Sequence, residues 1–198
     1  MKSQLNFSLK SSNSFSFESI TPCLYSPESI DDLRELSLLS LEHFYILGEG
    51  SNTLFLSQIS PIIIQPKLMG IEVEEDETSY FITAGSGENW HQLVAYCVEN
   101  GYAGLENLAL IPGSVGAAPI QNIGAYGVEL SNVIEEVSWY EFATQTLHKF
   151  SKAQCQFDYR DSIFKQQLKD KGIITQVRLK LPKTWQANVN YQGLDTLE

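Results

Sequence analysis

The stretch IPGSVGAAPIQNIGAYGVEL, residues 111–130, limits most what this chain can fold into, because glycine and alanine make up much of it. So many small residues fit either a flexible linker or an ordered backbone surface that a ligand can approach closely. A flexible spacer would be interrupted by serine and charge, whereas this stretch is interrupted by apolar residues. These are Ile111, Val115, Ile120, Ile123, Tyr126 and Val128. We therefore predict an ordered segment.

A second loop of small residues, GEGSN at 48–52, directly follows the apolar strand candidate FYIL. We expect its backbone to leave a sheet edge, where glycine allows tight turning and close approach of a ligand. The loop lacks the lysine of a GxxxxGK[ST] phosphate loop and the long helix that follows a GxGxxG fingerprint. Taken alone, GEGSN is explained equally well by a plain turn.

The two loops together favour a ligand site. Small side chains at 113–118 leave amide groups free to meet a phosphate or a planar ring, and two such loops could hold the pyrophosphate of a dinucleotide. Gln121 and Asn122 add amide donors and acceptors, while Ile120 and Ile123 could flank an aromatic heterocycle. Close packing of a turn against a helix remains the alternative for this loop.

Composition restricts the classes of partner. The 198 residues suit one large domain or two small ones, and 43% of them are hydrophobic. A net charge of -11 argues against broad binding to nucleic acid or to an anionic membrane. The first residues, MKSQLNFSLK, lack the apolar core of a signal peptide, and no apolar run reaches the ~18 residues of a membrane span. We expect a soluble, cytoplasmic protein without membrane insertion.

Cysteine and histidine give little support to a metal site or a nucleophile. Cys23, Cys97 and Cys155 are widely separated, without a CxxC pair or a local histidine cluster, so we expect buried thiols. The three histidines are solitary as well, and His91 is expected on a helix rather than as a general base. No metal is predicted.

Hydrophobic periodicity and turn residues predict the order of the elements. A helix is expected at 29–40, with Ser29 as its N-cap, and another within 85–101. The first elements, within 13–66, would form a small β-α-β-β layer. The expected strands are 19–25, 44–47, 54–57, 61–66, 69–76, 79–84, 133–142, 146–150 and 172–182.

FDYRDSIF, residues 157–164, places Arg160 between Tyr159 and Asp161 in an aromatic frame. A guanidinium can bind a carboxylate through two parallel hydrogen bonds, so Arg160 could hold an anionic substrate. A salt bridge from Arg160 to Asp161 or to a glutamate is the alternative, and composition alone favours it. The residues themselves leave both interpretations open.

Four segments, in their order and spacing, resemble a known family. GEGSN, GSGENWHQLV, GLENLALIPGSVGAAPIQNIGAYGVEL and YRDSIFK resemble the UDP-N-acetylenolpyruvoylglucosamine reductase family, also called UDP-N-acetylmuramate dehydrogenases. The resemblance covers residues 13–191. It implies an α+β protein with the PCMH-type (vanillyl-alcohol-oxidase-like) FAD-binding fold, made of two α+β subdomains. The implied boundaries are 14–184 for the FAD-binding domain, divided into 14–66 and 67–184, and 185–198 for the start of a truncated C-terminal substrate-binding region.

The resemblance also implies a reaction. It is that of a flavoenzyme of bacterial peptidoglycan-precursor synthesis with non-covalent FAD and with NADPH as hydride donor. The reduced flavin passes hydride to a UDP-sugar enolpyruvyl ether, UDP-N-acetylglucosamine enolpyruvate, which becomes UDP-N-acetylmuramate. The sequence identifies no protein partner.

Site residues follow from the same resemblance. Arg160 matches the catalytic arginine, which binds the substrate carboxylate and stabilises the charge that develops during hydride transfer. Tyr191 matches a tyrosine that contacts substrate. The residues implied in cofactor binding are Gly48, Glu49, Gly50, Ser51, Asn52, Thr53, Pro112, Gly113, Ser114, Gly116, Ala117, Ala118, Ile120, Gln121, Asn122, Gly124, Ala125 and Tyr126.

The main departure from the family concerns length. The family's proton-donating serine and catalytic glutamate lie in a C-terminal domain with no counterpart in these 198 residues. We therefore expect an FAD-binding portion of a reductase, with a flavin-binding module without turnover as the alternative. A flavin oxidase with another substrate is a third hypothesis, which the match around YRDSIF weakens. Smaller departures, at Ser14, Ala117 and Ala118, preserve side-chain size and are compatible with FAD.

Overall fold

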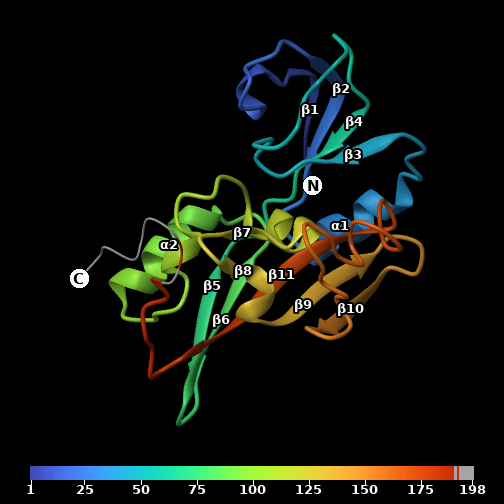
Figure 1. Ribbon diagram of the computed structural model, residues 1–198. Coiled ribbons are helices and arrows are strands. Elements are labelled where there is room, and N and C mark those ends of the chain that lie inside the picture. Colours follow the sequence, from blue (N-terminus) through green and yellow to red (C-terminus); the bar gives the residue numbers. More distant parts are fainter. Residues whose placement is uncertain (190, 192–198) are drawn as a thin grey trace.

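The computed structural model describes residues 1–189 and 191. They form two main sheets, with helix α1 (Ile30–Leu38) between them and helix α2 (Trp90–Glu99) on the second (Figure 1). The first sheet contains, in spatial order, β1 (Lys2–Ser8), β2 (Ile20–Ser26), β4 (Ile62–Ile64) and β3 (Phe44–Ile46). The second contains β10 (Thr146–Ser151), β9 (Ile134–Glu141), β11 (Gly172–Pro182), β6 (Ser79–Gly85) and β5 (Ile71–Glu75). The sheets thus use successive parts of the chain, and the exact subdomain boundaries stay a prediction.

The first sheet is mixed and the second is antiparallel. β1 pairs antiparallel with β2, whereas β4 runs parallel to both β2 and β3. The sequence pattern does not predict β1, because this edge strand has no buried residue. Only Phe7 packs against a core cluster, so the strand lacks the alternation of buried and exposed side chains by which strands are identified.

The strand expected at 54–57 is wrong. These residues form an irregular loop in which Leu54 is 50% and Leu56 is 90% exposed. Only Phe55 packs on the cluster that contains Leu24 and Ile63 of the first sheet. Nearby Ile59 makes an isolated bridge with Ile20. The other expected strands and both expected helices are present close to the predicted positions.

Helix α1 packs against both sheets. It begins where Ser29 Oγ accepts a hydrogen bond from the Asp32 amide at 3.1 Å, which confirms the expected N-cap. Leu33 and Leu36 are buried on its inner face. The other buried members of their cluster, which come from or adjoin both sheets, are Ile64, Leu68, Tyr140 and Ile173.

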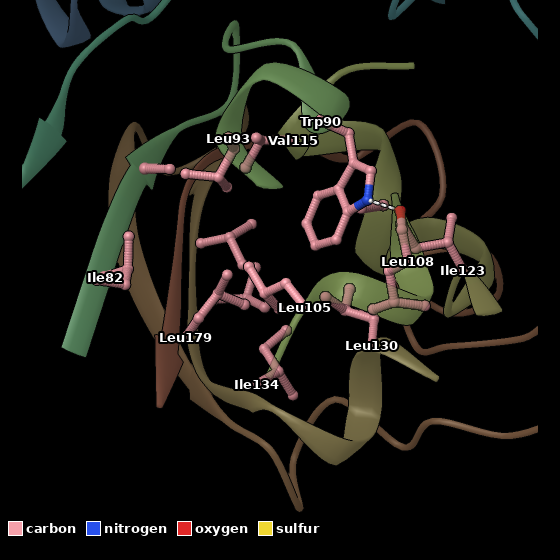
Figure 2. Packing of buried hydrophobic residues seen from close by; sticks show 14 of the residues in the cluster. Ile82, Trp90, Leu93, Leu105, Leu108, Val115, Ile123, Leu130, Ile134 and Leu179 are labelled. Atoms are coloured by element: carbon pink, nitrogen blue, oxygen red, sulfur yellow. Dashed lines mark hydrogen bonds between the residues drawn. The ribbon is translucent and has the colours of Figure 1, made fainter. Parts of the chain in front are cut away.

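The largest core lies between α2 and the second sheet. Trp90, Leu93 and Cys97 recur on one face of α2 and are at most 1% exposed. Figure 2 shows the Trp90 indole beside Leu108, to whose carbonyl its Nε1 donates at 2.9 Å. Because this buried N–H has an acceptor, burial of the indole carries no cost of an unpaired hydrogen-bond donor. Trp90 thus fixes the start of α2 within the core.

The stretch 111–130 is ordered, as predicted. It contains a 3₁₀ helix (Val115–Gln121) and a short ribbon of β7 (Gly124–Ala125) and β8 (Val128–Glu129). Its buried apolar residues are Val115, Ala118, Ile123 and Leu130. The other 3₁₀ helices are Lys10–Ser12, Glu106–Leu108 and Leu130–Asn132. Apolar residues between the glycines therefore hold the segment against the core.

Within residues 1–189 and 191, no helix combines the length and apolar character that crossing a bilayer requires. The same residues contain no group of three or more His, Cys, Asp or Glu side chains placed to hold a metal ion. All three cysteines are free and buried, which confirms the expected buried thiols.

We expect the thiols of the folded chain to resist an aromatic disulfide reagent at about pH 8. Burial raises the pKa of Cys97 to about 12, with a smaller contribution from the Glu106 carboxylate, and burial also raises the pKa of Cys155 to about 12. Both thiols should react only after urea unfolds the chain. Labelling of the folded protein as fast as of the unfolded protein would contradict this expectation.

The same pKa values predict a loss of stability in alkali. They lie above the ordinary thiol value of 9.0, so the unfolded chain loses these protons first. The stabilising contribution is complete below about pH 9 and declines as the pH rises towards 12. The urea midpoint should fall over this range, and by less when both cysteines are replaced by alanine.

Candidate functional site

The two loops of small residues meet at a cavity of about 510 Å³. From the first loop, the lining includes Gly48, Glu49, Gly50, Ser51, Asn52 and Thr53. From the second loop, it includes Pro112, Gly113, Ser114, Gly116, Ala117, Ala118, Ile120 and Gln121. The structure therefore brings together most of the residues that the sequence indicates, from two segments that are far apart in the chain.

The first loop leaves its sheet directly after β3. Gln65 Nε2 donates to the Gly48 carbonyl at 2.7 Å, which holds the beginning of the loop beside β4. Gly50 then turns the chain in the left-handed region, with φ of 70°. A Cβ at Gly50 would lie 1.8 Å from the Ser12 carbonyl oxygen, so a larger residue would displace the segment that carries Ser12.

The second loop is bound to the segment that begins α2. The Trp90 amide donates to the Gly113 carbonyl at 2.9 Å, and the Val115 amide donates to the Glu88 carbonyl at 2.8 Å. The two hydrogen bonds run in opposite directions, one donated by the α2 segment and one donated by the second loop. The loop and the start of α2 therefore form one hydrogen-bonded unit.

Asn89 connects the first loop to the same place. As N-cap of α2, its Oδ1 accepts from the Gln92 amide at 2.9 Å. Its Nδ2 donates to both oxygens of the Glu49 carboxylate, at 2.8 and 3.0 Å. One side chain thus caps the start of α2 and positions an acidic residue of the cavity lining.

Direct contacts join the two loops. Ser51 Oγ donates to the Pro112 carbonyl at 3.1 Å, and Asn52 Nδ2 donates to Gln121 Oε1 at 3.2 Å. These contacts hold the loops around the cavity instead of leaving them as independent turns.

Gly48 allows the closest approach between the loops. A Cβ placed on it would lie 2.8 Å from Ser114 Oγ and 3.3 Å from Ala117 Cβ. The first distance is shorter than ordinary packing permits, so a Cβ at this position would require the Ser114 side chain to move.

Other parts of the lining were not indicated by the sequence. They come from β3, β9, β11, the start of α2, the segment after Arg160 and single residues that follow β4 and β6, which only tertiary packing brings together. Buried strand residues give the same signal whether they face a core or a cavity, and the segment after Arg160 has no regular period. These residues are Tyr45, Ile46, Leu47, Pro66, Ser86, Trp90, Trp139, Phe164, Lys165, Gln166, Leu168, Lys169, Asp170, Gly172, Ile173 and Ile174.

The lining carries charge of both signs. Glu49 and Asp170 are acidic, and Lys165 and Lys169 are basic. In the part of the chain that the structure describes, neither lysine forms an ion pair with a carboxylate. A strongly acidic protein therefore places two cations beside a cavity, where they can attract an anionic ligand.

Four of the expected cofactor residues do not line the cavity, and they are Asn122, Gly124, Ala125 and Tyr126. Asn122 is 2% exposed, its Nδ2 donates to Glu129 Oε2 at 2.8 Å, and its Oδ1 accepts from the Ser131 amide at 2.9 Å. In this structure Asn122 stabilises the turn after the second loop, and its contact with a cofactor stays a prediction. The sequence could not distinguish these roles, because an amide side chain suits both.

Tyr126 and Tyr191 lie together outside the cavity. Their rings meet edge to face with centroids 5.6 Å apart, and each residue is about half exposed. The pair therefore offers aromatic surface to a ligand beyond the cavity lining.

Arg160 is exposed at the tip of a turn closed by a bridge between Asp158 and Asp161. Its Nη2 donates to the Gly124 carbonyl at 3.2 Å, and its own carbonyl accepts from Lys165 Nζ at 2.7 Å. Arg160 does not line the cavity, but these bonds link it to the second loop region and to a lining residue.

The salt bridge considered as an alternative for Arg160 is not formed with Asp161. Instead, Asp161 Oδ1 accepts from the Ser162 amide at 2.9 Å and from Gln166 Nε2 at 3.0 Å. Within the described residues no carboxylate is paired with Arg160. Its charge thus remains unneutralised by the neighbouring acid.

His91 has no catalytic geometry. It lies in the first turn of α2, where its Nδ1 accepts from the Leu110 amide at 3.3 Å. This agrees with the expectation of a helix residue.

Known proteins resemble the chain in sequence. The family described as FAD binding domain matches residues 21–147. The UDP-N-acetylenolpyruvoylglucosamine reductase of Pseudoalteromonas translucida is 48% identical over 169 residues, which cover 85% of this chain and 50% of that protein. The chain spans about half the length of the curated relatives it matches.

Solved structures resemble the fold. The UDP-N-acetylenolpyruvylglucosamine reductase of Thermus caldophilus superposes with a TM-score of 0.71 at 26% identity, over 91% of this chain and 61% of that one. p-Cresol methylhydroxylase superposes with a TM-score of 0.57 at 13% identity, over 83% of this chain and 36% of that one. The second likeness concerns the fold alone. Together they confirm the expected α+β, PCMH-type fold.

Replacing Gly50 by alanine should lower the free energy of unfolding more than the same replacement at a glycine whose φ is also positive but whose surroundings are open. Gly101 is the matched control, because its φ of 76° is also positive but a Cβ there would meet nothing within 4 Å. Gly101→Ala should cost about 1 kcal/mol of unfolding free energy for the left-handed backbone. Gly50→Ala adds a clash with backbone and should cost about 2–5 kcal/mol in urea unfolding. Equal losses would contradict the tight contact with Ser12.

Proposed function

Since the chain belongs to the FAD binding domain family and is a relative of UDP-N-acetylenolpyruvoylglucosamine reductases, we propose that its cavity binds FAD non-covalently. We further propose that it serves NADPH-dependent reduction of UDP-N-acetylglucosamine enolpyruvate to UDP-N-acetylmuramate, a step of peptidoglycan-precursor synthesis. The observation that carries the proposal is the meeting of GEGSN and the second loop at one cavity, where the two loops contact each other directly.

The residues present fit a flavin nucleotide. A cavity of about 510 Å³ lies within the range of ligand sites, and glycines in its lining let the two loops pack closely against neighbouring segments. Backbone amides of the first loop are suited to the pyrophosphate, whereas the Val115 and Gly116 amides already donate within the protein. Lys165 and Lys169 supply compensating charge. Trp139, Phe164 and Ile174 give an apolar portion of the lining for a planar ring. When bound, FAD supplies the hydride-transfer chemistry of the site.

Arg160 is proposed to hold the substrate. Its guanidinium is exposed and lacks a carboxylate partner among the described residues, so it is available for the carboxylate of an enolpyruvyl group. The same charge would stabilise negative charge that develops on the substrate during hydride transfer. Tyr191 is proposed to contact substrate as well, next to Tyr126.

A flavin-binding module without turnover is the second candidate. It is favoured by one observation, that the chain spans about half the length of its curated relatives. In that case the 198 residues would bind FAD without turning over the substrate.

A visible absorption spectrum tests FAD binding and reduction. We expect the purified chain, loaded with FAD and freed of excess cofactor, to retain the flavin bands, because the loops are fixed by their own hydrogen bonds. NADPH added without oxygen should bleach these bands, and substrate should restore them if the chain is competent in turnover. Retention without restoration would support the module, and a colourless chain would contradict the proposed FAD site.

Arg160→Ala should weaken substrate binding without removing FAD. Loss of a charged hydrogen-bond partner costs about 1.5–3 kcal/mol, so the Kd for the enolpyruvyl substrate should rise about 10- to 150-fold in a titration of the FAD-loaded chain. Arg160→Lys should retain part of the affinity, because it keeps the charge but not the planar fork.

Arg34→Ala is the control for this test. Arg34 is a surface arginine paired with Asp31 on α1, away from the cavity lining, so its loss should leave both ligands unaffected. Wild-type affinity in Arg160→Ala would refute the proposed role of Arg160.

A further inference from the structure

Ser86 carries a buried polar atom for which the protein supplies no partner. Among residues 1–189 and 191, its Oγ is the one fully buried side-chain oxygen or nitrogen without a hydrogen bond. The residue directly follows β6, is 2% exposed and lines the cavity. A buried hydroxyl without a partner costs free energy, so the folded chain alone does not account for serine here.

The backbone of Ser86 is already engaged. Its amide donates to the Thr175 carbonyl at 2.9 Å, and its carbonyl accepts from the Gly116 amide at 2.9 Å. A Cβ on Gly116 would lie 2.6 Å from Ser86 Cβ, so the second loop passes directly over this residue. Ser86 is therefore held rigidly between β11 and a loop of the cavity, with only its hydroxyl left to form a further bond.

We propose that the Ser86 hydroxyl donates a hydrogen bond to bound FAD, which makes Ser86 a further cofactor-binding residue. The inference rests on the proposed FAD site and adds a contact outside the two glycine loops. FAD carries acceptors along its whole length, namely ring nitrogens and carbonyl oxygens, ribityl hydroxyls and phosphate oxygens. The cavity lining also includes buried Trp90 and Ala118, and a hydrogen bond in poorly hydrated surroundings is strengthened.

Ser86→Ala tests the contact through two equilibria. The Kd for FAD, measured by the change in flavin fluorescence on titration into the cofactor-free chain, should rise about five- to tenfold. The urea stability of the cofactor-free chain should stay the same or increase, because the lost hydroxyl has no partner in the protein. If the hydroxyl had only a structural role, Ser86→Ala would lower the urea stability of the cofactor-free chain and leave the Kd for FAD unchanged.

Two further variants keep the result interpretable. Ser79→Ala is the matched control: Ser79 is a buried serine of β6 outside the cavity lining, with its Oγ 3.2 Å from Thr78 Oγ1. It should leave FAD affinity unchanged. Ser86→Cys keeps nearly the same size but offers a weak donor, so its Kd should also rise, even if Ser86→Ala fails to fold.

The outcomes separate this inference from the proposed function. Unchanged FAD affinity in Ser86→Ala and Ser86→Cys, with tight binding by the wild-type chain, would overturn only the role of Ser86 and would indicate a buried water as its partner. The role of Ser86 would also be overturned if Ser86→Ala and Ser79→Ala lowered the urea stability of the cofactor-free chain by the same amount. Failure of the wild-type chain to bind FAD would overturn the proposed function and this inference together.

Discussion

The hydrogen bonds of Asn89 at the start of α2 are the interaction on which the site depends. One amide side chain caps the helix through Gln92 and holds the carboxylate of Glu49. The adjacent Trp90 amide holds the second loop at Gly113. Because consecutive residues bind both loops, the distance between the loops is set by the geometry of one helix end and does not depend on two independent turns.

That helix end is itself fixed by burial. Trp90, Leu93 and Cys97 place α2 in the largest core, and the Trp90 indole is bonded to Leu108. The cluster around Leu33 and Leu36 of α1 contains residues of both sheets. Since the first loop emerges from one sheet and the second loop rests on the other, these two clusters determine the shape of the cavity.

The charges of the site differ from the charge of the whole protein. A chain with net charge -11 places Lys165 and Lys169 in the cavity lining and leaves Arg160 without a carboxylate partner among its described residues. Lys165 also donates to the Arg160 carbonyl, so the proposed cofactor and substrate regions share a contact. Net charge therefore limits broad polyanion binding without preventing the binding of a small anionic ligand.

The sequence by itself determined most of the elements and the two loops, because caps, periodicity and small residues act over a few neighbouring positions; β1 and the false strand at 54–57 are the exceptions. Ser29 shows this for a helix start, and GEGSN shows it for a loop at a strand end. Only the tertiary structure decided that Asn122 is used within a turn, that Asp161 is not the partner of Arg160, and that the Ser86 hydroxyl is buried beside the cavity. The physical reason is that these roles depend on which groups from distant segments come within hydrogen-bond distance, and packing of the two sheets and helices sets those distances.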